Sequence, residues 1–95
     1  GPGAPGLSID EALRVVENLP DPKRVTVDHI MLSGGEPLVW PELLLTTLHA
    51  IHAKFGPHTE LMMQTNGDLL DEAMLKKLLD AHVNHISVAS QDKYL

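Results

Sequence analysis

The chain has 95 residues, which sets an upper limit of one domain with a modest hydrophobic core. Its 43% hydrophobic content predicts a folded chain, and the net charge of −6 with only seven Lys and Arg argues against a surface for nucleic acid or anionic membranes. No apolar run approaches the roughly 18 residues that cross a bilayer, and no signal peptide is evident. We therefore expect a cytoplasmic protein.

Cysteine is absent, so this chain offers no disulfide and no thiolate ligand for a metal cluster. His49 and His52 are three residues apart on a predicted helix and share a face, but no carboxylate or third histidine lies at a spacing that completes a metal site. We expect structural or surface roles for all six histidines, which are His29, His49, His52, His58, His82 and His85.

The chain opens on a leader at 1–7 that is rich in Gly and Pro, and the folded region is expected over 8–95. Ser8 and Glu11 are spaced as a capping box at the start of a helix whose apolar positions recur as far as Leu19. Pro20 and the proline two residues later end this helix.

The apolar run at 30–32 is too short and too closely followed by glycine for a helix, so it predicts a buried strand. A second helix begins at Pro41, where a missing N–H costs nothing, and ends at Gly56-Pro57. Trp40 precedes it, and we interpret this side chain as filling the gap between loop and helix rather than as stacking on a ligand.

A second strand is predicted over 60–64, and Thr65-Asn66-Gly67 follows it as a turn. The third helix begins after Asp71 as N-cap, and the third strand covers 85–90. This order predicts an α/β fold with about three parallel strands and three helices, in which two βαβ units share the middle strand. Met62 and Met63 should point to opposite sides of the sheet.

Two glycines, a carboxylate and a proline follow the first strand. Gly34 and Gly35 let peptide groups approach a ligand, and Pro37 biases Glu36 toward an extended backbone at the carboxyl edge of the sheet. A carboxylate beside bare carbonyls suits an ammonium group and would repel a phosphate, which argues against a phosphate-binding turn. The alternative interpretation is a tight turn in which Glu36 is a solvated residue favoured by a helix dipole.

The segment from Ser33 to Leu38, Gln64-Thr65-Asn66-Gly67, and Ile86-Ser87-Val88 together resemble the core of radical S-adenosylmethionine enzymes. The similarity extends roughly from Ser8 to Ser90. It implies a portion of a partial (β/α)6 TIM-like barrel, covering the second to fourth of six strands.

The resemblance also implies roles for individual residues. Gly34, Gly35, Glu36 and Pro37 match the segment that holds the methionine ammonium group of S-adenosylmethionine. Ser87 matches a hydroxyl near the carboxylate or ribose of that cofactor, although a hydroxyl satisfied inside the barrel wall is the alternative. Ser90 and Asp92 are weaker candidates for the same rim. The cofactor-binding candidates are Ser33, Gly34, Gly35, Glu36, Pro37, Gln64, Thr65, Asn66 and Ser87.

The family's CxxxCxxC loop, which supplies three thiolates to a 4Fe-4S cluster, would precede the helix at Ser8, where this chain has only residues 1–7. In an intact enzyme, the resemblance implies that reductive cleavage of S-adenosylmethionine yields a 5'-deoxyadenosyl radical that abstracts hydrogen from substrate. We expect the chain alone to be inactive. The alternative is a cysteine-free relative that serves as a ligand-binding or scaffold domain.

The remainder of the barrel is the partner that the resemblance implies, and the substrate class, a small molecule or a peptide, is left open. Exposed sheet edges also predict association between copies of the chain.

Overall fold

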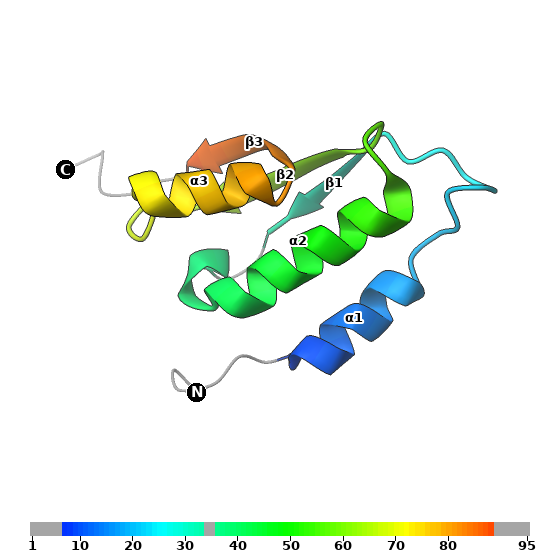
Figure 1. The fold of residues 1–95 in the computed structure, drawn as a ribbon, viewed down its shortest axis with the longest axis horizontal. Coiled ribbons are helices and arrows are strands. Elements are labelled where there is room, and N and C mark those ends of the chain that lie inside the picture. Colours follow the sequence, from blue (N-terminus) through cyan, green and yellow to red (C-terminus); the bar gives the residue numbers. More distant parts are fainter. Residues whose placement is uncertain (1–6, 34–35, 89–95) are drawn as a thin grey trace.

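The computed structural model describes residues 7–33 and 36–88, which form a three-stranded sheet with helices packed on it (Figure 1). Its strands are all parallel and lie in the order β1-β2-β3, which confirms the predicted α/β fold. The elements are α1 (Ile9–Glu17), β1 (His29–Leu32), the 3-10 turn η1 (Pro37–Val39), α2 (Pro41–Phe55), β2 (Glu60–Thr65), α3 (Glu72–Asp80) and β3 (Val83–Val88).

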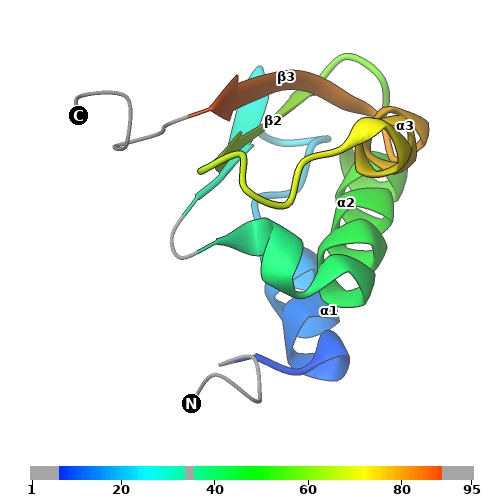
Figure 2. The same cartoon turned by 90° about the vertical axis from the view of Figure 1, so that its left-hand side faces the viewer.

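The helices lie on one side of the sheet and leave its other face open (Figure 2). Along β2 the burial alternates, because successive side chains of a strand point to opposite faces. Leu61 and Met63 are buried under the helices, whereas Met62 is only partly buried on the opposite face, as predicted for the adjacent methionines. The core between sheet and helices is completed by apolar residues of α2 and α3, which include Leu48, Ile51 and Leu78.

The predicted capping box starts α1, since the Ser8 hydroxyl accepts from the Glu11 N–H and the Glu11 carboxylate accepts from the Ser8 N–H, each at 3.1 Å. The helix ends at Glu17, two residues before Leu19, because the Asn18 side chain donates back to the Arg14 carbonyl at 2.9 Å. From α2, the Lys54 ammonium donates to three carbonyls at this end of α1. They belong to Val16, Glu17 and Leu19, at 2.7–2.9 Å.

The third strand starts at Val83, two residues earlier than expected, and the predicted end at Ser90 lies outside the described residues. His82 adopts a left-handed φ of 74°, which stops the turn after α3 and brings Val83 into register with Leu61. The register then shifts past Asn84, whose side-chain oxygen accepts from the Leu61 N–H at 2.8 Å. The sequence analysis predicted neither this bulge nor the short turn η1. The bulge depends on the pairing of β3 with β2, and η1 is a single turn that begins at Pro37.

Candidate functional site

Glu36 lies where the chain leaves β1, and its carboxylate caps the turn that follows. Its backbone is extended, with φ −117° and ψ 104°, as expected for the residue before Pro37. Its Oε2 accepts from the Leu38 N–H at 3.0 Å. The local sequence therefore sets the extended backbone of Glu36 and supplies the first hydrogen-bond donor to its carboxylate, the Leu38 N–H.

The same carboxylate reaches across to the end of β2. Thr65 donates its hydroxyl to Oε2 of Glu36, and Asn66 donates its backbone N–H to Oε1, each at 2.7 Å. These two bonds join the carboxyl ends of neighbouring parallel strands, so the interpretation of Glu36 as a merely solvated turn residue is wrong. Sequence reasoning grouped these three residues at one rim but did not foresee that they bond to each other.

Glu36 stays ionised at neutral pH. Partial burial raises the pKa of its carboxyl, but the hydrogen bonds from Asn66, Thr65 and Leu38 outweigh burial and hold the pKa below the usual glutamate value. Each carboxylate oxygen can accept about two hydrogen bonds. Counting donors from residues 7–33 and 36–88, Oε2 accepts two hydrogen bonds and Oε1 accepts one, which leaves one acceptor position on Oε1.

A single free acceptor on an anion favours a ligand with one N–H directed at that oxygen. A primary ammonium group meets this need, because its other two N–H groups can turn to other acceptors. A guanidinium group binds a carboxylate best through both oxygens at once, and Oε2 is already taken. The chemistry of Glu36 therefore favours an ammonium ion.

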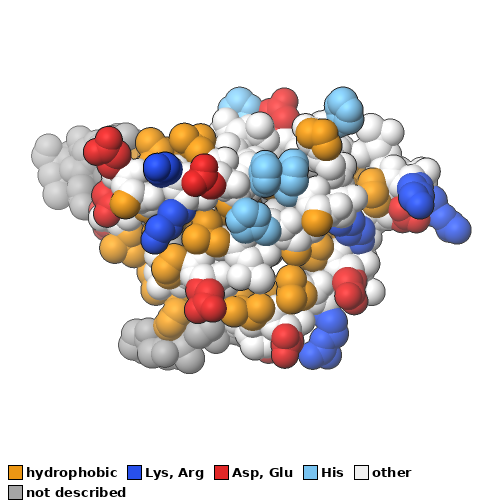
Figure 3. Space-filling view, viewed as in Figure 1, with side chains coloured by type: hydrophobic (Ala, Val, Ile, Leu, Met, Phe, Trp, Pro, Cys, Tyr) orange, Lys and Arg blue, Asp and Glu red, His pale blue; other side chains and the backbone are white. Residues whose placement is uncertain are grey.

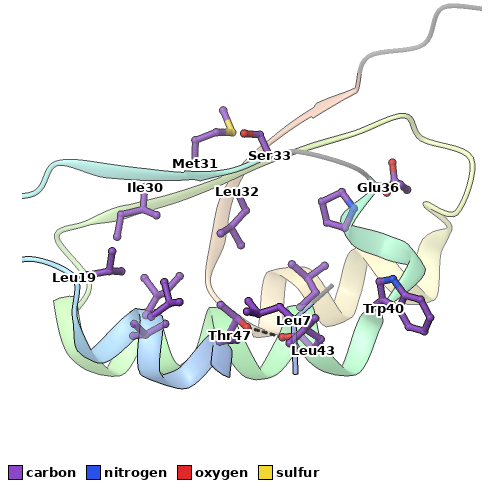
Figure 4. Close-up of a pocket in the computed structure, with 16 residues that line it drawn as sticks. Leu7, Leu19, Ile30, Met31, Leu32, Ser33, Glu36, Trp40, Leu43 and Thr47 are labelled. Atoms are coloured by element: carbon purple, nitrogen blue, oxygen red, sulfur yellow. Dashed lines mark hydrogen bonds between the residues drawn. The ribbon is translucent and has the colours of Figure 1, made fainter. Parts of the chain in front are cut away.

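Three further candidates point to the open face of the sheet. Gln64 and Ser87 are partners in the register of β2 and β3 and both are exposed. Figure 4 shows Ser33 on the side of β1 opposite the helices, together with Met31. Ser33, Gln64 and Ser87 thus lie at the carboxyl ends of three adjacent strands, on the face that the helices leave free.

The other candidates are distributed differently. Thr65 is 2% exposed and donates its hydroxyl proton to Glu36, so it supports the carboxylate from inside the fold and does not face a ligand. Pro37 begins η1 and is partly buried. Gly34, Gly35, Ser90 and Asp92 lie outside the described residues.

Beside this rim, an apolar pocket of about 610 Å³ opens between α1, α2 and β1 (Figure 4). Ile30 and Leu32 point into it from β1, Leu43 approaches from α2, and Leu19 approaches from the segment that follows α1. Trp40, which is partly buried, also lines this pocket. A pocket so poor in polar groups suits apolar side chains.

Histidine side chains gather over the middle of the molecule in the view of Figure 3. His82 stacks on His52 with 3.5 Å between ring centroids, and His49 approaches His82 edge-on at 6.0 Å. Over 7–33 and 36–88, no three His, Cys, Asp or Glu side chains are grouped to hold a metal ion. Within the same residues, each helix is too short or too polar to cross a lipid bilayer.

Comparison with known proteins gives a family match. The model of the Radical SAM superfamily matches residues 1–92. The PqqA peptide cyclase of Granulibacter bethesdensis is 33% identical over 86 residues, which are 90% of this chain and 21% of the cyclase. The chain therefore spans about a fifth of the length of this relative. No solved structure matches the chain significantly.

Proposed function

Because this chain belongs to the Radical SAM superfamily, we propose that the rim around Glu36 binds the methionine end of S-adenosylmethionine. In this proposal the free position on Oε1 of Glu36 accepts one N–H of the cofactor's ammonium group. Ser33, Gln64 and Ser87, on the open face, lie next to the rest of the cofactor. The observation that carries the proposal is an ionised carboxylate, joined to the neighbouring strand end, with one acceptor position that no donor of the described residues fills.

The residues present do not fit the second group that the family implies. A 4Fe-4S cluster needs thiolate ligands, and the chain contains no cysteine. We therefore assign this chain the binding of the cofactor's amino-acid end only. Generation of a 5'-deoxyadenosyl radical would belong to an intact protein whose cluster ligands come from outside this sequence. Three cysteines upstream in the reading frame would distinguish that enzyme from a cysteine-free binding domain.

Isothermal titration of S-adenosylmethionine into the chain at pH 7 tests the proposed contact. Glu36→Ala should weaken binding about 10- to 100-fold, because it removes a hydrogen bond to a charged acceptor. Glu42→Ala, which changes an exposed glutamate of α2, is the matched control and should bind as the wild type does. Equal affinity of the wild type and Glu36→Ala would contradict the proposal.

We also propose the rest of a barrel as the partner of this chain, in an intact protein located in the cytoplasm. Within the described residues β1 is hydrogen-bonded on one side only, and the apolar pocket opens along it. A further parallel strand beside β1 would pair with its free edge and bury the pocket lining. The substrate class is a small molecule or a peptide, and the name of the similar cyclase favours a peptide.

A further inference from the structure

The two oxygens of Glu36 are treated differently by the fold. Within the described residues, Oε2 accepts from the Leu38 N–H and the Thr65 hydroxyl, whereas Oε1 accepts from the Asn66 N–H alone. The Thr65 bond is therefore what fills the second position on Oε2. Without it, both oxygens would have one open position and the carboxylate would present no preferred oxygen to a ligand.

The direction of the Thr65 hydroxyl is fixed by its surroundings. Its oxygen accepts from the Gly67 N–H at 3.2 Å, and its single proton is then directed to Glu36, 2.7 Å away. Thr65 is 2% exposed, so water does not compete for either contact. Its β-branched side chain has few rotamers, which further restricts the hydroxyl.

The loop that follows β2 lies close to β3 at Gly67. Gly67 has φ +87°, and a Cβ at this position would come within 2.8 Å of Cγ1 of Val88 on β3. A hydrogen bond within the loop stabilises its turn, because the side-chain oxygen of Asn66 accepts from the Asp68 N–H at 2.9 Å. The ends of β2 and β3 thus set the position of the donors that hold Glu36.

From these contacts we infer that Thr65 is a positioning residue for ligand binding. Its hydroxyl occupies the second acceptor position of Oε2 and leaves Oε1 as the oxygen that meets an ammonium group. This inference rests on the proposed function, since the ligand is the ammonium group of S-adenosylmethionine. It adds that the affinity of Glu36 for this group depends on a buried hydroxyl that the ligand does not touch.

Two variants of Thr65 test the inference. Thr65→Val keeps the shape and removes the hydroxyl, and Thr65→Ser keeps the hydroxyl. The first readout needs no ligand: the carboxyl ¹³C shift of Glu36 is followed against pH by NMR. Its pKa should rise in Thr65→Val and stay near the wild-type value in Thr65→Ser. A well-dispersed amide spectrum of each variant establishes that it is folded.

The second readout is the affinity for S-adenosylmethionine at pH 7. Thr65→Val should bind about 5- to 10-fold more weakly, the effect of one hydrogen bond, and Thr65→Ser should restore binding. The inference would be overturned if the pKa of Glu36 were unchanged in Thr65→Val. It would also be overturned if that pKa rose while the affinity for S-adenosylmethionine stayed the same. In either case, Glu36→Ala would still test the proposed function separately. Failure of the wild type to bind the cofactor would instead overturn the proposed function, and the inference with it.

Discussion

Glu36 connects the backbone that follows β1 with the end of β2, and its ionised form makes these contacts. Three donors converge on a carboxylate that is only partly buried. Hydrogen bonds to a charged group are stronger than those between neutral groups, so ionisation of this one side chain affects the stability of the whole rim.

The pKa shift of Glu36 predicts a pH-dependent contribution to stability. The pKa is lower in the folded chain than in the unfolded chain, so the contribution is fully present above the ordinary glutamate pKa of about 4.3. It is lost as the pH falls through that value toward the folded pKa. Glu36→Gln should reduce the free energy of unfolding by about 1–3 kcal/mol at pH 7, and the deficit should shrink toward pH 3.

Urea denaturation of the wild type and Glu36→Gln between pH 7 and pH 3 measures this difference. Glu17→Gln, which changes an exposed carboxylate of α1, is the control and should show only a small deficit at pH 7. A deficit of Glu36→Gln that stays constant over the whole range would refute the assignment.

Gly67 is the second residue on which the rim depends. Gly67→Ala should destabilise the chain by about 2–4 kcal/mol, since alanine pays for a left-handed backbone and its Cβ presses on Val88. Combined with Val88→Ala, the same change should cost less, because the second substitution removes the opposing methyl group. Thermal unfolding of the four chains in this double-mutant cycle gives the coupling, and strictly additive effects would show that the contact is not tight.

At the scale of elements, Lys54 fastens α1 to α2. A helix leaves its last carbonyls without partners inside the helix, and the ammonium group of Lys54 satisfies those of Val16, Glu17 and the following turn at Leu19. The cation also complements the negative end of the α1 dipole. This contact holds α1 in place along the apolar pocket.

Lys54→Met keeps most of the aliphatic packing and removes the three hydrogen bonds. We expect a loss of about 1–3 kcal/mol in the free energy of unfolding, because three carbonyls lose a charged donor. Lys76→Met, at an exposed position of α3, should have a much smaller effect. Hydrogen exchange of α1 amides distinguishes local from global effects: faster exchange confined to α1 is expected, and equal effects of the two variants would contradict this role for Lys54.

On the scale of the whole molecule, the sheet formed by the described residues has one face covered by helices, one face that they leave open, and an outer edge on β1 (Figures 1 and 2). Met31 belongs to this edge strand and is 42% exposed. An unpaired edge is a template for another strand, so copies of this chain should associate through it.

Sedimentation velocity over a range of concentrations should therefore show association of the wild-type chain. Met31→Lys should weaken it, because a charge beside an edge strand opposes pairing. Leu79→Lys introduces the same charge at an exposed apolar position of α3 and should leave association unchanged. A monomer whose sedimentation does not vary with concentration would count against edge pairing.

The sequence by itself determined the order of the elements and the strand ends that carry polar residues. These features depend on local signals, such as the capping box at Ser8, the proline at the start of α2 and the glycines after the strands. The parallel sheet followed from that order, and so did the placement of Glu36, Thr65 and Asn66 at one rim.

Only the tertiary structure decided how these residues act on one another. The hydroxyl of Thr65 turns to Glu36, and Lys54 reaches the end of α1, through contacts between residues about 30 or more positions apart. The bulge at Asn84 likewise arises from pairing with β2. A hydrogen bond between distant segments depends on the distance and direction between donor and acceptor, which tertiary packing sets. The local sequence pattern predicts neither of them.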